Sequence, residues 1–247
     1  IVAVPHPNIQ SCKPALWSLA IFLIGFRKPA CRVEHSTASR QVRLQKKEPI
    51  KSVTRSRLKS LEDVSLSAEY IYAHNFAKGA EGALAAIFSV SGLSLTDNER
   101  ALFKECDPFG VILFKRNCDT PEQVSSLVKD IKETLGRDCP VLIDQEGGRV
   151  QRLKPPHWRE HKPMQYFGNL YTENAEKGLE ALRFETFRLA EELVELGVNV
   201  NCAPVLDIII EGAHDIIGDR SFSSDPEIVT RLGISVCRHF LKSGVLP

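Results

Sequence analysis

The chain has 247 residues with 43% hydrophobic and 26% charged residues and a formal net charge of +1. This composition is typical of a globular protein, and the length suits one large domain or two small ones. The near-neutral sum hides an asymmetry, because residues 1–60 carry twelve Lys and Arg against two Glu, which is +10 and leaves −9 for residues 61–247. The acidic part argues against a nucleic-acid-binding surface, so no nucleic acid partner is expected.

Residues 1–84 are predicted to form a basic extension of low order, separate from a globular domain at 85–247. The apolar run Ala15–Phe26 has twelve residues, whereas a transmembrane helix needs about 20, so no stable membrane span is predicted. The run has the length of a signal-peptide core, and residues 32–60 have the composition of a transit peptide. The extension is therefore a targeting segment, a disordered basic tail or an artefact of the gene model.

From Ala85 onward the pattern alternates between strands and helices. Strands are predicted at 85–90, 111–114, 141–143 and 198–203. Helices are predicted at 97–105, about 121–135, about 175–196 and about 226–243. Their ends carry local signals: Thr96 with Glu99 forms a capping box, Thr120 precedes a first-turn proline, and Gly136 ends a helix. Long loops are expected at 153–172 and 206–224.

Four βα units in series predict a parallel sheet with right-handed crossovers. A closed (β/α)8 TIM barrel needs eight strands and about 250 residues. The predicted fold class is therefore α/β, with about the first four βα units of such a barrel, and the residues up to Pro247 resemble the lead-in to a fifth strand. The open edges of an incomplete barrel are expected to need the missing C-terminal half or a covering partner.

Cysteine and histidine usage predicts no metal site. The seven cysteines are scattered, without a CxxC pair or a Cys/His cluster. His157 and His161 are four residues apart, but the neighbouring prolines argue against a helix, so both are interpreted as loop residues. Unpaired cysteines favour a reducing compartment, so we expect the globular part to be cytoplasmic.

The most informative segment is Asp144–Arg152, with the sequence DQEGGRVQR, directly after the predicted strand 141–143. In α/β folds this carboxyl end of a strand is where ligands bind. Asp144 supplies an acceptor, Arg152 supplies a donor fork for hydroxyls, carboxylates or phosphates, and the two central glycines permit close approach of backbone or ligand. An ordinary charged loop remains the alternative interpretation.

This segment resembles the substrate-binding signature of family 3 glycoside hydrolases, specifically the bacterial β-N-acetylhexosaminidases. Three further segments resemble the same family in the same order, and the likeness extends from about Ala85 to Pro247. These segments are Gly110–Asn117, Asn199–Asp207 and Ile217–Phe222. The resemblance implies a TIM-barrel hydrolase that uses neither a metal nor an organic cofactor.

The resemblance also implies roles for individual residues. Asp144 matches the carboxylate that accepts hydrogen bonds from two sugar hydroxyls, and Arg152 and Arg220 match two arginines that grip the sugar. Asp207, expected at the end of the fourth strand, is predicted either to orient Arg220 or the Asp144 loop, or to cap a loop. Glu146 is interpreted as structural, although with Asp144 it could form a glycosidase acid pair. Arg220 could instead form a structural salt bridge to Asp215, Asp219 or Asp225.

The resemblance implies removal of terminal, non-reducing N-acetylglucosamine by a retaining mechanism, including from peptidoglycan fragments during cell-wall recycling. The family's aspartate nucleophile and its histidine–aspartate acid/base are expected beyond Pro247, so no catalytic residue is assigned in this chain and the chain alone is predicted to be inactive. The expected partner is an N-acetylglucosamine-containing saccharide. Alternatives are a β-glucosidase of the same family and a non-catalytic carbohydrate-binding or decayed protein.

Overall fold

The computed structural model describes residues 79–210, 212 and 214–247. The strands are β1 (Leu84–Ser89), β2 (Pro108–Leu113), β3 (Val141–Ile143) and β4 (Val200–Asn201). The helices are α2 (Asp97–Cys106), α3 (Pro121–Leu135), α4 (Met164–Glu173), α5 (Ala175–Glu195) and α6 (Pro226–Lys242). Two short 3-10 turns are η5 (Lys115–Asn117) and η6 (Gly218–Arg220).

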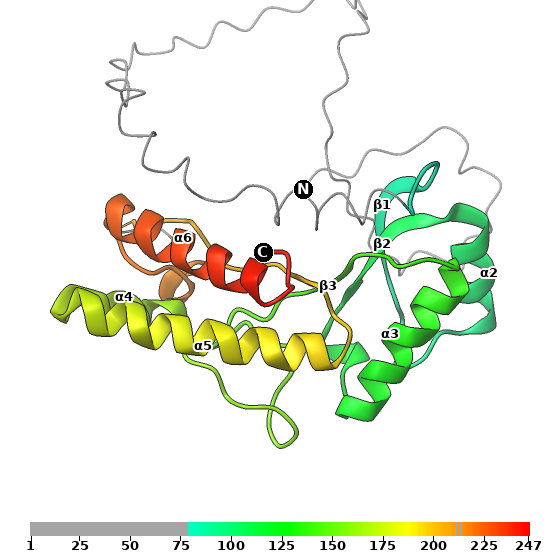
Figure 1. The fold of residues 1–247 in the computed structure, drawn as a ribbon, viewed down its shortest axis with the longest axis horizontal. Helices are drawn as coiled ribbons and strands as arrows, with labels where there is room; N and C mark the ends of the chain where they lie inside the picture. Colours follow the sequence, from blue (N-terminus) through cyan, green and yellow to red (C-terminus); the bar gives the residue numbers. More distant parts are fainter. Residues whose placement is uncertain (1–78, 211, 213) are drawn as a thin grey trace, which may run out of the picture.

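The four strands form one parallel sheet in the order β1-β2-β3-β4. In Figure 1, α2 and α3 lie beside β1 and β2, whereas α4, α5 and α6 form a second helical group beside β3. This arrangement confirms the predicted α/β fold, with successive βα units as in part of a (β/α)8 barrel. All four strands consequently point their carboxyl ends toward the same edge of the sheet.

The ends of α2 and α3 follow the signals in the sequence. Thr96 Oγ1 accepts a hydrogen bond from the Glu99 N–H at 3.2 Å, and the Glu99 carboxylate accepts one from the Thr96 N–H at 2.8 Å. The chain leaves α2 at Asp107 in the left-handed conformation. Thr120 caps α3, and Gly136 ends it. Each cap satisfies a backbone group that the helix itself leaves unpaired.

Three predicted elements were wrong in extent. The second strand, predicted at 111–114, begins at Pro108 and ends at Leu113. The segment 153–172, predicted as a loop throughout, contains most of α4, because Met164 and Phe167 bury one face of a helix against the core. The fourth strand, predicted at 198–203, has only two residues. Its ladder ends early because the chain turns, with the Ala203 N–H donating to the Asn201 carbonyl at 2.7 Å.

The last residues return to the sheet beside β4. Leu246 pairs in parallel with Val200, and its N–H donates to the Asn199 carbonyl at 2.9 Å. Leu246 also accepts a hydrogen bond from the Asn201 N–H at 2.8 Å. These bonds place Leu246 in an isolated parallel bridge beside β4, and the fifth strand itself remains a prediction.

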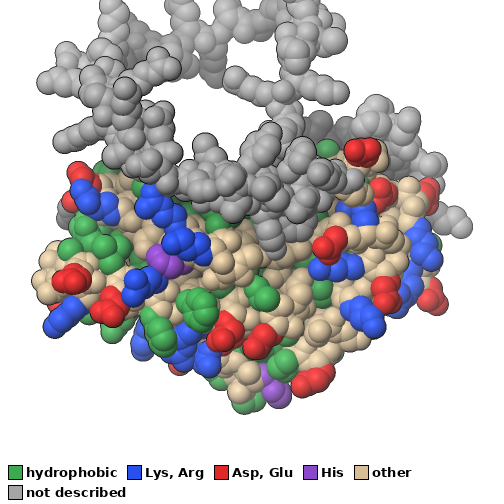
Figure 2. Space-filling view, in the orientation of Figure 1, with side chains coloured by type: hydrophobic (Ala, Val, Ile, Leu, Met, Phe, Trp, Pro, Cys, Tyr) green, Lys and Arg blue, Asp and Glu red, His purple; other side chains and the backbone are tan. Residues whose placement is uncertain are grey.

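The helical surface in view carries both charged and apolar groups. Hydrophobic side chains interrupt the charged surface over α5 and α6 in Figure 2, and Phe184 and Phe187 are 61% and 54% exposed. Within the described residues, no helix combines the length and hydropathy that crossing a membrane requires. The predictions for residues 1–78 lie outside the described part of the chain, and the need for a covering partner remains a prediction.

Candidate functional site

Asp144 and Arg152 meet at the carboxyl edge of the sheet, directly after β3. Arg152 Nη2 donates to Asp144 Oδ2 at 2.7 Å. The two side chains remain 23% and 27% exposed, for Asp144 and Arg152 respectively, so solvent and ligands can reach the pair. Arg152 Nε is buried and has no hydrogen-bond partner among the described residues. The structure therefore brings together two predicted sugar-binding groups with polar capacity left unused.

Gln145 and Asn201 fix the start of this segment against β4. The Gln145 N–H donates to Asn201 Oδ1 at 3.0 Å, and Asn201 Nδ2 donates to the Gln145 carbonyl at 2.9 Å. Gln145 Oε1 in turn accepts the N–H groups of Arg152 and Leu153 at 2.9 and 3.1 Å. Both amide residues are completely buried. Because a buried polar group left unpaired costs about 1–3 kcal/mol, this exchange of bonds strongly favours one loop conformation.

Glu146 positions Arg220 at the same edge of the sheet. Arg220 Nε and Nη2 donate to the two carboxylate oxygens of Glu146 at 2.8 and 2.7 Å, a bidentate arrangement that fixes the plane of the guanidinium. The Glu146 side chain is 4% exposed. Hydrogen bonding to Glu146 raises the pKa of Arg220, to which the charges of Asp144 and Asp207 also contribute. Arg220 therefore lies within electrostatic reach of Asp144.

Arg220 forms a salt bridge, but not to Asp215, Asp219 or Asp225, which were the partners considered from the sequence. Its partner is Glu146, and the expected contacts with neighbouring aspartates are taken over by Arg149. Arg149 Nη2 donates to the backbone carbonyls of Asp215 and Ile217 at 2.7 and 2.8 Å, and Arg149 Nε lies 3.0 Å from Asp219 Oδ1. The loop after β3 thus holds the η6 turn through two separate arginine contacts.

The two glycines of this segment permit an approach by backbone. Gly147 and Gly148 have φ angles of 93° and 58°, which favour glycine. A Cβ atom on Gly147 would lie 2.4 Å from the Lys162 carbonyl oxygen, and one on Gly148 would lie 2.8 Å from Pro163 Cβ. The close neighbour of the glycine pair is therefore the chain at 162–163, which crosses directly over it.

Cys202 and Cys118 border the Asp144–Arg152 pair. Desolvation, together with the charge of Asp144 and a hydrogen bond to it, raises the pKa of the Cys202 thiol to about 12. Burial also raises the pKa of the Cys118 thiol to about 12, although Arg152 opposes the shift. Both thiols are consequently neutral at physiological pH and present weak, uncharged polar groups to the site.

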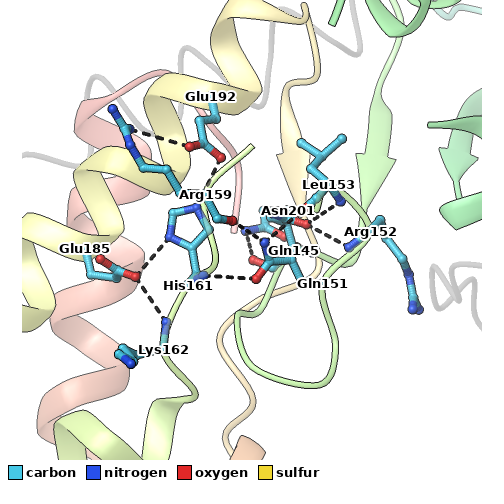
Figure 3. Close-up of polar contacts among 10 residues, drawn as sticks. All are labelled: Gln145, Gln151, Arg152, Leu153, Arg159, His161, Lys162, Glu185, Glu192 and Asn201. Carbon is cyan, nitrogen blue, oxygen red and sulfur yellow. Dashed lines mark hydrogen bonds and ion pairs between the residues drawn. The ribbon is translucent and has the colours of Figure 1, made fainter. Parts of the chain in front are cut away.

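The two loop histidines have different environments. His157 is exposed, whereas His161 is buried between Glu185 and Glu192 of α5, as Figure 3 shows. Both lie in a loop, as predicted, but the burial of His161 was not foreseen. The signal was present in the sequence, because glutamates seven residues apart share one face of a helix. No group of three His, Cys, Asp or Glu suited to a metal ion occurs among the described residues.

Asp207 does not end the fourth strand, which contradicts the sequence prediction. β4 stops at Asn201, and Asp207 lies six residues further on with an exposed side chain. Its backbone carbonyl accepts a hydrogen bond from Ser221 Oγ at 2.5 Å. The contact that orients Arg220 comes from Glu146 instead, while the Asp207 carboxylate acts on Arg220 only through its charge.

A parallel sheet with alternating helices and a carboxylate–arginine cluster at its carboxyl edge defines this chain as part of a (β/α) barrel enzyme architecture. Residues 59–247 match the Glycosyl hydrolase family 3 N terminal domain. The chain therefore belongs to glycosyl hydrolase family 3. The match begins upstream of residue 85, where the globular domain was expected to start, and that boundary remains a prediction.

Relatives within the family are named β-hexosaminidases. The chain is 37% identical over 150 residues to a β-hexosaminidase of Thiobacillus denitrificans, covering 61% of this chain and 41% of that protein. It is similar, with a TM-score of 0.59 and 31% identity, to NagZ from Neisseria gonorrhoeae, whose crystal structure is a complex with N-trifluoroacetyl-D-glucosamine. That similarity covers 63% of this chain and 46% of NagZ.

A third similar structure is a family 3 β-N-acetylglucosaminidase from Paenibacillus sp.. It has a TM-score of 0.58 and 31% identity, over 64% of this chain and 29% of that protein. The matched region of the chain thus spans less than half the length of each of these relatives.

Proposed function

We propose that this chain provides the sugar-recognition region of a β-N-acetylhexosaminidase that acts on terminal, non-reducing N-acetylglucosamine, in the manner of peptidoglycan recycling. One observation carries the proposal: the Asp144–Arg152 pair and the Glu146-oriented Arg220 meet at the carboxyl edge of the sheet. The names of the relatives support the substrate class, as does the N-acetylglucosamine analogue bound to NagZ.

The chemistry of the cluster suits a sugar. The Asp144 carboxylate accepts hydrogen bonds from hydroxyl groups, while Arg152 and Arg220 donate to hydroxyl oxygens. In the proposal, Asp144 binds two sugar hydroxyls, and the partly exposed guanidinium groups of Arg152 and Arg220 contribute the donors. Hydrogen bonds to charged groups are worth about 1.5–3 kcal/mol each, so a few of them give a monosaccharide measurable affinity.

The proposed reaction is retaining hydrolysis through a glycosyl-enzyme. In this mechanism the four βα units recognise the sugar, whereas the aspartate nucleophile and the histidine–aspartate acid/base lie outside residues 1–247. These units therefore bind and orient the sugar ring, whereas bond cleavage depends on the other groups. We accordingly expect the 247-residue chain to bind N-acetylglucosamine without hydrolysing a chromogenic N-acetylglucosaminide.

Isothermal titration with N-acetylglucosamine and with glucose tests the proposal. Asp144→Asn should weaken binding of N-acetylglucosamine about ten- to hundredfold, because it replaces charge-assisted bonds worth about 1.5–3 kcal/mol. The matched control is Asp119→Asn, at an exposed aspartate whose backbone bonds Gln123; its affinity should equal that of the wild type.

The outcomes separate the candidate functions. Binding of N-acetylglucosamine that is insensitive to Asp144→Asn would remove Asp144 from the site. A preference for glucose would favour a β-glucosidase of the same family. Turnover of the chromogenic substrate by this chain would contradict the assignment of the reacting groups to sequence that follows residue 247.

A further inference from the structure

A buried histidine beyond the sugar cluster joins the loop after β3 to α5. His161 Nδ1 lies 2.9 Å from Glu185 Oε1, and His161 Nε2 lies 3.1 Å from Glu192 Oε2. The residue is 2% exposed. Arg159 approaches the other oxygen of Glu192 at 3.5 Å, and the charge of Arg188 acts on Glu185. Among the described residues, Glu185 and Glu192 of α5 are thus the charged groups that act on the ring, and Arg159 and Arg188 act on these two carboxylates.

The backbone of His161 is bonded to the segment that carries Arg152. Its carbonyl accepts the Gly148 N–H at 2.9 Å, and its N–H donates to Gln151 Oε1 at 3.1 Å. Gln151 Nε2 donates in turn to the Leu153 carbonyl at 2.6 Å. Figure 3 shows this continuous series of contacts from α5 to Arg152. A shift of His161 would therefore move the residues on both sides of Arg152.

The two carboxylates select the charge of the ring. A neutral imidazole has one N–H donor, whereas both nitrogens of His161 face carboxylate oxygens, so only the imidazolium donates to both. Although burial alone lowers it, the hydrogen bonds to Glu185 and Glu192 raise the pKa of His161 above the usual value of 6.5. A raised pKa means that the contact is fully formed below the ordinary pKa and is lost as pH rises through the raised one.

We propose that His161 is a positioning residue for the sugar site, which fastens the loop 147–162 to α5 as a doubly donating imidazolium and thereby holds Arg152 against Asp144. The fastening follows from the contacts of this chain. Its consequence for sugar affinity rests on the proposed function. The two parts are separable, because the order of the loop can be measured without any sugar.

Amide hydrogen exchange of the 247-residue chain tests the fastening directly. Protection of the Gly148, Arg152 and Leu153 amides, corrected for the intrinsic pH dependence of exchange, should fall as pH rises through the titration of His161. His161→Gln keeps one donor and loses the charge, so it should lower this protection about tenfold at neutral pH, equivalent to about 1.4 kcal/mol. His157→Gln, four residues earlier and exposed, is the matched control and should leave protection unchanged.

If His161→Gln does not fold, the pH dependence of amide protection in the wild-type chain still tests the proposal, because that measurement needs no variant. Protection in the loop that stays constant while the His161 ring titrates would overturn the proposal, as would wild-type protection in a folded His161→Gln chain. Nuclear magnetic resonance of the His161 ring supplies the titration curve with which the loss of protection must coincide.

Titration with N-acetylglucosamine then tests the consequence. Affinity should fall with rising pH in step with the ring titration, and in His161→Gln it should be about tenfold weaker and insensitive to pH. Equal affinity and equal pH dependence in the variant would overturn the positioning role. A wild-type chain that binds no sugar while its loop still loosens with pH would contradict the proposed function and leave the fastening established.

Discussion

Residues 84–143 and residues 144–224 reach ordered structures in different ways. The first region relies on short-range signals, such as the Thr96 cap of α2, and on apolar side chains that pack against one another. The second relies on buried polar side chains that bond residues far apart in sequence. Gln145 pairs with Asn201, and Glu146 pairs with Arg220 across 74 positions. Polar long-range bonds fix side-chain geometry precisely, which a ligand site requires.

The contrast is one of degree. Asn117 in the first region is also completely buried and donates to the Val90 and Gly92 carbonyls. However, Asn117 joins two adjacent βα units, and it contacts none of the residues that are predicted to bind the sugar. In the second region, the buried residues Asn201 and His161 bond the segment Asp144–Arg152, and Glu146 of that segment bonds Arg220. We therefore expect substitutions of these groups to affect stability and the site together.

Asn201→Ala should have the largest effect on stability. It leaves the buried N–H and carbonyl of Gln145 without partners, each at a cost of about 1–3 kcal/mol, so we expect a loss of about 3 kcal/mol of unfolding free energy. Chemical denaturation measures the change. Asn169→Ala, at an exposed position of α4, is the control. A loss below 1 kcal/mol would mean that the loop adopts another conformation at little cost.

Gly168→Ala should have the second-largest effect on stability, and the cause is steric. A Cβ atom at Gly168 would lie 1.8 Å from the Phe222 carbonyl oxygen, so α4 and the loop beside α6 must separate. We expect the unfolding free energy to fall by about 2–3 kcal/mol, in the upper part of the range that is typical for an overpacked core. Gly92→Ala serves as the control in the first region, because no atom lies within 4 Å of the added carbon. Equal effects of the two substitutions would contradict this explanation.

Glu146→Gln should affect sugar affinity more than stability. The amide retains one acceptor for Arg220 but loses the charge and the bidentate geometry. Because Arg220 then samples more orientations, we expect N-acetylglucosamine to bind about tenfold more weakly, equivalent to about 1.4 kcal/mol. Glu160→Gln, at an exposed position, is the control for titration calorimetry. Unchanged affinity would indicate that Arg220 does not contact the sugar.

The same division explains what the sequence could predict. β3 was placed at its observed bounds, and α2 and α3 within a residue, because caps and apolar periodicity act over a few residues. The assignment of Asp144 and Arg152 to one site followed from their position after a buried strand and from family resemblance, whereas their direct ion pair was not predicted. The pairing of Glu146 with Arg220 depends on how the chain folds between them, and no local pattern encodes it.

The errors have physical causes as well. α4 was missed because 153–172 is rich in proline and aromatic residues, although Met164 and Phe167 have helical spacing. Asp207 was placed at a strand end because an apolar run precedes it, whereas the turn after Asn201 had already ended the strand. Apolar runs thus mark burial reliably, but backbone pairing decides where a strand stops.

Thr96→Ala should have the smallest effect and should be confined to the first region. It removes both the acceptor for the Glu99 N–H and the hydroxyl donor to the Glu99 carboxylate, so we expect a loss of about 1 kcal/mol of unfolding free energy. Thr230→Ala, at an exposed position of α6, is the control. Because Thr96 lies far in sequence from every predicted sugar contact, N-acetylglucosamine affinity should stay at the wild-type value. A loss of affinity would show that the two regions are coupled, and that local capping in α2 also supports the site after β3.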